Sequence, residues 1–523
     1  MNVFRNVESA SDLQHRDSIT TTRVLALWKW YSKSRRSNIP LPPGPPGDPL
    51  IGNLRMMPRT YQPEAFYEWS KKYGDVMYLN VLGEHMIVLN SNKAAVDLLE
   101  KRSGNYSDRP PFPMHDLIGW SHFLAFLPYG DRFQRQRKLF QQPLTKKGVL
   151  VYQNMQTEAT HILLNNLLQT PAAFDEHVRR WATSVIMEIA YGRRITSDDD
   201  PYIKIAEDIN DAITAAGDPG AAPPDLFPIL KKLPAWFPGA WWSKLSKDSE
   251  PLIYNMTEVP FQDVKKNLEA GTATTSFLSL HMEELLREGN KNPQDWYDIK
   301  IAAAHIYGAG GDTTFSTLVT FIYAMLLFPD AQQKAKEELD RVIGSTRLPD
   351  FSDRESLPTF ERILRESYRW HQAAPLGIPH KAQADDVYRG MFIPKGAVII
   401  SNIRGITLDE NVYTDPHKFD PDRYLPQPEG NGEPFISSQF GYGRRVCPGQ
   451  YLADNSLWIA AASILTVFDI VPVQDEKGHD IIPEVHFTNG LTSHPKPFPC
   501  SLRPRSEKAA ALIRHAYQDA IQA

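Results

Sequence analysis

Apolar residues recur at helical spacing along most of this chain. They return every three or four positions, which is the repeat of a helix that packs one face against a core. The clearest cases are residues 94–101, 157–168, 181–190 and 331–343. The two longest apolar stretches, 315–328 and 457–470, also contain Ser and Thr. We therefore interpret both as buried core helices and not as membrane spans.

Alternation of apolar and polar residues indicates a smaller amount of β-structure. Residues 76–81 and 85–89 alternate and are joined at Gly83, which is the pattern of a hairpin. A second strand region is expected over residues 387–400, broken by two Gly-containing turns, and another near the C-terminus. The predicted fold class is mainly α with small β-sheets (α+β).

Composition divides the chain into four parts. Residues 1–38 form a leader in which 19–31 is a candidate amphipathic membrane-associating helix; a helix packed on the body or a disordered leader are the alternatives. Residues 39–49 (IPLPPGPPGDP) are a proline-rich hinge that cannot continue a helix. Residues 50–505 form one large domain, because no Gly/Ser-rich linker divides them, and 506–523 form a C-terminal tail.

Charge and cysteine content exclude some classes of protein. The formal net charge of −5 argues against a nucleic-acid-binding surface. A hydrophobic content of 42%, with 24 Phe, 21 Tyr and 11 Trp, supplies ample surface for a large core. Only Cys447 and Cys500 are present, which excludes a disulfide framework and favours a reducing compartment.

One of the two cysteines stands in a glycine-rich loop directly before a long apolar stretch. Residues 440–449 read FGYGRRVCPG and contain Cys447. Backbone N–H groups in such a loop point at the sulfur, which predicts a lowered pKa and a thiolate able to bind a metal. The alternative is a buried structural cysteine, which is the commoner fate of a single Cys.

The spacing within this loop resembles the haem-binding loop of the cytochrome P450 family, F-x-x-G-x-R-x-C-x-G. The matching residues are Phe440, Gly443, Arg445, Cys447 and Gly449. The resemblance extends from about the proline hinge to about residue 499 and implies the P450 fold, with a single large haem domain. It also implies haem b as the cofactor, with the Cys447 thiolate as the axial iron ligand.

A polar interruption in a long apolar helix gives a second match. Residues 309–313 read AGGDT, and two adjacent glycines cost about 1 kcal/mol each relative to Ala inside a helix. Such a cost indicates close approach of another group to the backbone or local widening of the helix. The stretch resembles the family motif A/G-G-x-D/E-T. By that resemblance Thr313 hydrogen-bonds dioxygen at the haem, and Asp312 belongs to the relay that delivers protons.

A third match is a charged pair on one helix face. Glu366 and Arg369 stand at i and i+3, so their side chains can form an ion pair. The family joins such an E-x-x-R pair to a downstream arginine, which implies a structural network of Glu366, Arg369 and Arg423. Removing one partner of a buried ion pair costs about 3–5 kcal/mol, so loss of any member should first reduce haem retention.

Haem carries propionates, and the resemblance implies cations that hold them. Arg445 matches one such position, and Arg137 matches the arginine of the family's W-x-x-x-R helix. Phe133 replaces the Trp of that motif and has no N–H to donate. His380 matches a third position, with an ordinary surface or core histidine as the alternative.

The sequences of these motifs resemble those of fungal secondary-metabolism members of the family. The implied function is a haem-thiolate monooxygenase that oxidises an apolar scaffold, a terpenoid first and a polyketide or indole otherwise. Electrons would come from a NADPH-dependent flavoprotein reductase, so NADPH and flavin act only through that partner. The alternatives are a haem-thiolate isomerase, dehydratase or peroxygenase of the same fold, or a non-catalytic haem-binding protein.

The resemblance also implies where the other partners bind. The basic residues Arg132, Arg135, Lys138 and Arg444 are candidates for reductase docking, with a solvated charged face as the alternative. Specificity positions are expected around 111–123, 209–219, 305–309, 374–378 and 488–492. Residues 233–242 (LPAWFPGAWW) are typical of a membrane-dipping loop or a lid, or else of core packing. We expect a peripheral, cytosol-facing location on the endoplasmic reticulum membrane, with a soluble cytoplasmic protein as the alternative.

Overall fold

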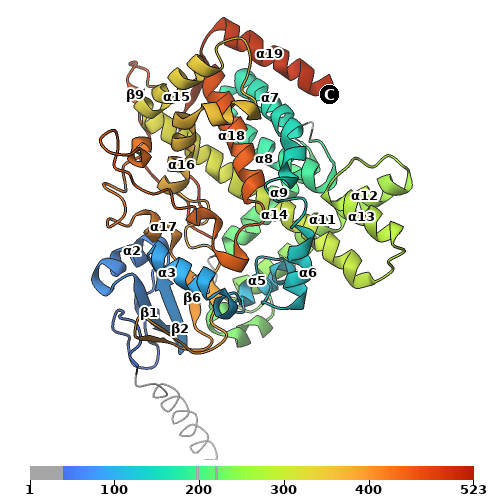
Figure 1. Cartoon of the computed structure of the whole chain (residues 1–523). Coiled ribbons are helices and arrows are strands. Elements are labelled where there is room, and N and C mark those ends of the chain that lie inside the picture. The colour runs from blue at the N-terminus through green and yellow to red at the C-terminus, as the bar shows by residue number, and fades with distance from the viewer. Residues whose placement is uncertain (1–38, 196, 198, 218–221, 523) are drawn as a thin grey trace, which may run out of the picture.

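Helix α14 (Pro293–Leu327) runs through the centre of a helical body and is buried along most of its length (Figure 1). The computed structural model describes residues 39–195, 197, 199–217 and 222–522. The leader predicted at residues 1–38 therefore lies outside the described residues. Helix α14 packs most extensively on α8 (Phe174–Tyr191) and also on α18 (Gln450–Val467).

The other helices surround this core. They are α2 (Gln62–Tyr73), α3 (Asn92–Ala95), α4 (Ser103–Tyr106), α5 (Pro113–Leu117), α6 (Asp131–Leu139), α7 (Gln153–Gln169), α9 (Pro201–Ala216), α10 (Pro223–Leu226), α11 (Trp241–Thr257), α12 (Val259–Glu269), α13 (Phe277–Arg287), α15 (Pro329–Val342), α16 (Pro358–Trp370), α17 (Ile403–Thr407) and α19 (Glu507–Gln522). Shorter turns are η1 (Leu54–Met56), η2 (Val96–Lys101), η3 (Trp120–His122), η4 (Gly148–Tyr152), η5 (Pro171–Ala173), η6 (Pro228–Lys232), η7 (Phe351–Ser356), η8 (Pro421–Tyr424), η9 (Ser438–Phe440) and η10 (Gly443–Arg445).

The main sheet lies at one side of the helical body (Figure 1). The main sheet has the order β1 (Val76–Val81), β2 (Glu84–Leu89), β6 (Val398–Ser401), β3 (His380–Lys381), in which only the β2–β6 pair is parallel. Two-stranded pairs are β4 (Asp386–Tyr388) with β5 (Met391–Ile393), β7 (Phe468–Val471) with β10 (Ser501–Pro504), and β8 (Val473–Gln474) with β9 (Asp480–Ile481). The predicted mainly-α class with small sheets is confirmed.

Both ends of the described chain are attached to the body. The proline-rich segment lies extended along the sheet, where the carbonyls of Pro40 and Pro43 accept the N–H groups of Phe392 (2.7 Å) and Tyr78 (2.9 Å). At the other end, α19 packs on α7 and buries Ile513. The chain predicted as a tail is thus a docked amphipathic helix.

The structure differs from the predicted elements in two places. The apolar stretch 457–470 is helical only to Val467, and Phe468 begins β7, which pairs with β10. A buried strand has the same continuous apolar character as a buried helix, so periodicity does not mark the change. The stretch 94–101 is split between α3 and the π-helical η2.

No single helix among the described residues is long and apolar enough to cross a membrane. Helices α14 and α15, bent by 104° at their junction, pass that test only as a pair. Residues 315–326 of α14 are buried almost throughout, as expected of the core helix predicted there.

The two adjacent glycines of α14 have different surroundings. A Cβ on Gly310 would lie 2.6 Å from Cδ1 of Ile186 on α8, so this glycine allows the close approach of the two helices. A Cβ on Gly311 would meet only Oγ1 of Thr183, at 3.8 Å. Helix α14 keeps its α-helical form through both residues, so close approach, and not local widening, accounts for Gly310.

These neighbouring glycines provide a matched pair of substitutions. Gly310→Ala should destabilise the protein by about 1–2 kcal/mol, because the clash with Ile186 outweighs the gain in helix propensity. Gly311→Ala should stabilise it by about 0.5–1 kcal/mol, since only the propensity changes. Thermal unfolding of the two variants measures the difference, and an equal rise in both midpoints would contradict tight α8–α14 packing.

Candidate active site

Cys447 stands between η10 and the start of α18. Its backbone N–H donates to the carbonyl of Phe440 at 2.8 Å, which closes the loop. Gly443 has φ 58°, and a Cβ there would overlap the carbonyl oxygen of Leu99, so only glycine fits. Gly449 follows the cysteine and directs its N–H toward the sulfur. The glycines of the loop therefore determine the immediate surroundings of the sulfur.

The predicted lowering of the Cys447 pKa is wrong in its net direction. Burial raises the pKa of the thiol above its ordinary value, although the N–H of Gly449 and the charge of Arg137 act to lower it. The loop alone does not hold a thiolate, and a bound metal ion would supply the missing positive charge.

Two of the predicted cations lie beside the loop. Arg137, on α6, donates through Nη1 to the carbonyl of Val446 at 2.7 Å. Arg445 donates to three backbone carbonyls, and its guanidinium lies 3.8 Å from the ring centre of Phe133. Phe133 therefore stacks against a cation where the family Trp would donate a hydrogen bond.

His380 lies in the same region, beside an arginine that the sequence did not reveal. The buried ring of His380 uses Nδ1 to contact the carbonyl of Tyr106 at 2.7 Å. Burial, with the charge of Arg109 acting in the same direction, holds the pKa of His380 well below its ordinary value, so the ring is neutral. Arg109 donates to the carbonyls of Ala125 (2.9 Å) and Pro379 (2.8 Å). Its segment, Asp-Arg-Pro-Pro, carries no pattern that predicts a buried arginine.

Positive charge in this region exceeds what the protein compensates. Arg109, Arg137 and Arg445 form no ion pair with any carboxylate of the described residues and bond only to carbonyls. Burial lowers the pKa of Arg109 and Arg445, and the nearby Asp108 opposes this only in part. The Oδ1 of Asp108 accepts the N–H of Tyr129. Three guanidiniums with a single carboxylate near two of them fit a group with two carboxylates, as haem has in its propionates.

Helix α14 borders this region. Residues 301–307 and 314–316 are buried, whereas Ala309 between them is exposed. An exposed residue in the middle of a core helix indicates accessible space inside the body. The helix contacts both α6, which carries Arg137, and α18, which begins directly after the cysteine loop. The space beside Ala309 therefore lies among the elements that carry the predicted site.

Asp312 and Thr313 follow Ala309 by one turn. The Oγ1 of Thr313 donates to the carbonyl of Ala309 at 2.8 Å. The carboxylate of Asp312 is buried and finds no hydrogen-bond partner among the described residues; the nearest cation is Nη1 of Arg179, at 3.7 Å. Asp312 also acts on His494, although burial dominates and lowers the pKa of that histidine. The Thr313 hydroxyl is thus held by a hydrogen bond, whereas the neighbouring Asp312 carboxylate is not.

The structure brings Glu366, Arg369 and Arg423 together. The Glu366 carboxylate accepts hydrogen bonds from Nε and Nη2 of Arg369, at 2.8 and 2.7 Å, and from Nε of Arg423, at 3.1 Å. Tyr424 adds its hydroxyl at 2.7 Å. Glu433, which the sequence did not single out, binds the far side of Arg423 at 2.6 Å. All these charges are buried and mutually compensated.

Comparison with known proteins agrees with this geometry. The sequence model of the family described as cytochrome P450 matches residues 42–501. The chain belongs to the cytochrome P450 family. Cytochrome P450 monooxygenase 136 of Postia placenta is 38% identical over 95% of this chain and 94% of its own. Cytochrome P450 monooxygenases of Armillaria gallica (94% and 97%) and Ampulloclitocybe clavipes (91% and 88%) are each 39% identical.

This cytochrome P450 binds haem b through a cysteine thiolate and is a monooxygenase of the fungal type. Cys447 stands in the matching loop, whereas Cys500 is buried at the start of the C-terminal β-structure. Residues Arg137, Arg445, His380 and the missed Arg109 would hold the propionates, and the thiolate would be stabilised by the iron. Bound haem supplies the activation of dioxygen.

The buried network predicts how this P450 retains its haem. Glu366→Gln should cost about 3–5 kcal/mol, because Arg369 loses the carboxylate that compensates it and Arg423 keeps only Glu433. The adjacent Arg365→Gln removes an exposed ion pair with Glu361 and should cost at most about 0.5 kcal/mol. Haem content per chain and the thermal midpoint of both variants test this. Equal haem content in the two would show that the network does not support the haem side of the core.

Proposed function

We propose that this P450 oxidises an apolar secondary-metabolite scaffold, with a terpenoid as the first substrate class and a polyketide or indole as the next. Electrons would come from a NADPH-dependent reductase. The observation that carries oxygen activation is the Asp312–Thr313 pair beside the exposed Ala309. The apolar character of the substrate is supported by the 111–123 segment, which buries Phe112, Trp120 and Phe123.

Asp312 is suited to moving a proton. Its carboxylate is attracted to Arg179 at 3.7 Å without being fixed by a hydrogen bond, so the side chain can rotate about its single bonds. A pocket between α8, α9 and α14 reaches Asp312 and is lined by Arg179, Glu207 and Asn210. These groups offer water a polar path from the α9 side to the carboxyl group.

Thr313 would act as the receiving end of this relay. A hydroxyl has one proton to donate and two lone pairs that accept. Because the Thr313 proton is committed to the Ala309 carbonyl, its lone pairs remain for a water or a protonated group. The hydroxyl can therefore orient a proton donor in the space beside Ala309.

Thr313→Ala tests the proposed oxidation directly. Loss of the hydroxyl should raise the NADPH consumed per product molecule about tenfold, because proton delivery is misdirected. Thr317→Ala is the matched control: its hydroxyl, one turn further along α14, donates to the Thr313 carbonyl at 2.8 Å. Coupling is measured as the ratio of product to NADPH with a reductase present. Unchanged coupling in Thr313→Ala would remove this residue from the relay.

Reductase docking is proposed for the exposed cations near the cysteine loop. Arg135 is engaged by Asp298 at 3.1 Å, and Arg132 lies over the ring of Tyr297. Lys138 and Arg444 are exposed, and Arg444 extends past the loop to the hydroxyl of Tyr129 at 2.8 Å. These two residues are the better supported members of the predicted set.

Membrane association is proposed at an exposed aromatic patch. The patch consists of Phe227, Ile229, Trp236, Phe237 and Trp241, and Trp236 is 80% exposed. All five residues are exposed and lie between positions 227 and 241, and exposed large apolar side chains favour the acyl region of a bilayer. We propose that this surface contacts the cytosolic face of the endoplasmic reticulum membrane.

Replacing the tip of the patch tests this. Trp236→Ser with Phe237→Ser should weaken binding to phosphatidylcholine vesicles about tenfold, since two apolar side chains no longer enter the bilayer. Val151→Ser is the control, because Val151 is similarly exposed at 77% but lies in η4, outside the patch. Vesicle co-sedimentation gives the partition coefficients. Equal binding by all three proteins would contradict the assignment of the patch.

A further inference from the structure

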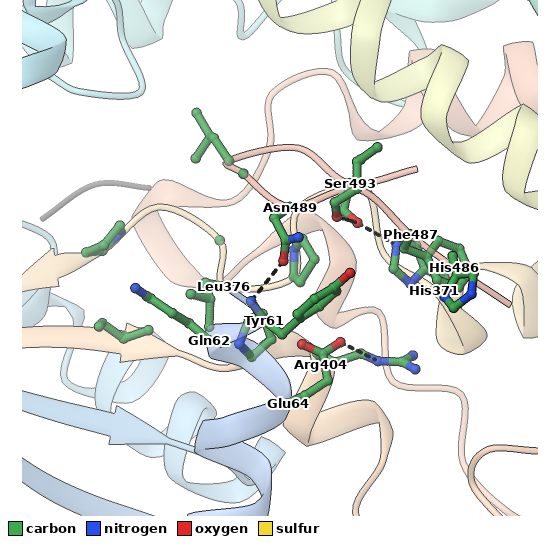
Figure 2. Close-up of a pocket in the computed structure, with 18 of the residues that line it drawn as sticks. Tyr61, Gln62, Glu64, His371, Leu376, Arg404, His486, Phe487, Asn489 and Ser493 are labelled. Atoms are coloured by element: carbon green, nitrogen blue, oxygen red, sulfur yellow. Dashed lines mark hydrogen bonds and ion pairs between the residues drawn. The ribbon is translucent and has the colours of Figure 1, made fainter. Parts of the chain in front are cut away.

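A pocket opens between the N-terminus of α2 and the 485–493 segment (Figure 2). One wall is formed by Pro375, Leu376, Gly377 and Pro379, and the carbonyl of Pro379 accepts Arg109 at 2.8 Å. The pocket therefore shares a wall with the cationic cluster beside Cys447. A hydrogen bond from the N–H of Tyr61 to Oδ1 of Asn489, at 2.8 Å, connects the two sides of the pocket.

Arg404 in this pocket uses few of its donors. A guanidinium carries five N–H bonds. Among the described residues, its only hydrogen bond is from Nη1 to the carbonyl of Trp370, and its Nε is buried without a partner. By contrast, Arg369 and Arg423 each donate to a carboxylate and to several carbonyls. The structural arginines of this protein are saturated, and Arg404 is not.

The acid nearest to Arg404 is a weak partner. Nε of Arg404 lies 3.8 Å from Oε1 of Glu64, which is beyond hydrogen-bond distance (Figure 2). The Arg404 side chain is only 13% exposed, whereas that of Glu64 is 46% exposed. A solvated carboxylate compensates a buried cation poorly. Burial accordingly lowers the pKa of Arg404 to about 10.

The histidines of the pocket add no second cation. His371 is 4% exposed, and burial holds its pKa well below the ordinary value, so the ring is neutral. Its ring stacks on Phe487 with centroids 3.5 Å apart, and Nε2 contacts Oγ of Ser493 at 2.9 Å. His486 is paired with Glu484 at 3.0 Å on the exposed side. Arg404 is thus the buried positive charge among the lining residues.

We propose that this pocket binds an apolar molecule through a carboxylate, which replaces Glu64 as the partner of Arg404. The guanidinium has free donors for a charge-assisted pair. Around it Met86, Leu376, Ile400 and Leu491 supply an apolar lining for the body of the ligand. The pocket includes Leu376 and Leu491, from the 374–378 and 488–492 segments expected to set substrate specificity. The inference therefore rests on the proposed oxidation and narrows its ligand to an apolar carboxylate, whereas its test measures binding and needs no turnover.

Dodecanoate is the probe for this site, with 1-dodecanol as the uncharged control. Calorimetric titration of the holoenzyme should show that Arg404→Gln weakens dodecanoate binding about tenfold or more and leaves dodecanol binding unchanged. Glu64→Gln should strengthen dodecanoate binding about threefold, since it removes the internal competitor. Arg341→Gln, which removes an exposed arginine of α15, should bind dodecanoate as the unsubstituted protein does.

The two substitutions in the pocket have opposite expected signs, which a merely structural role for Arg404 would not produce. Unchanged dodecanoate binding by Arg404→Gln would overturn the proposal. So would an equal loss of dodecanol binding, because that result would reflect collapse of the pocket and not recognition of the anion. If Arg404→Gln fails to fold, Glu64→Gln decides alone: weaker or unchanged dodecanoate binding overturns the proposal.

Discussion

The surplus of buried positive charge beside Cys447 is the constraint on which the rest of the site depends. Arg109, Arg137 and Arg445 are held by backbone carbonyls, which orient a guanidinium without neutralising it. Leaving such charges unpaired in a protein interior is costly, so a dianionic group such as the haem propionates would complete the folded state. Haem binding would then contribute to the stability of this fold.

In the Glu366 network, by contrast, the buried arginines are fully compensated by carboxylates of the protein. There the carboxylates of Glu366 and Glu433 compensate Arg369 and Arg423 within the protein, and carbonyls satisfy the remaining donors. A closed network needs no ligand and gives a rigid support for the segments that lead to the cysteine loop. The Glu366 network is thus complete within the protein, whereas the Arg109, Arg137 and Arg445 cluster would be completed by the cofactor.

The motifs of the site could be predicted from sequence because each depends on short spacing. Within each motif the matching residues are at most ten positions apart: the Cys447 loop spans 440–449, Asp312 and Thr313 are adjacent, and Glu366 and Arg369 stand at i and i+3. The roles of Arg109 and Glu433 could not be predicted from sequence, because no local pattern records their contacts. Arg109 binds the carbonyl of Pro379, 270 residues away, and Glu433 binds Arg423, 10 residues away. The main helices and the hairpin followed from periodicity, whereas the helix-to-strand change at Phe468 did not.

The net pKa of Cys447 shows why a correct motif can carry an incorrect electrostatic argument. The N–H of Gly449 and the charge of Arg137 act as the loop sequence suggests, but burial outweighs both. Burial is a property of the whole fold, to which α6, α14 and α18 all contribute, and no loop sequence contains it. The same low-dielectric surroundings that disfavour a free thiolate would strengthen its bond to a cation. The chain therefore builds a poor site for a bare thiolate and a good one for a thiolate bound to iron.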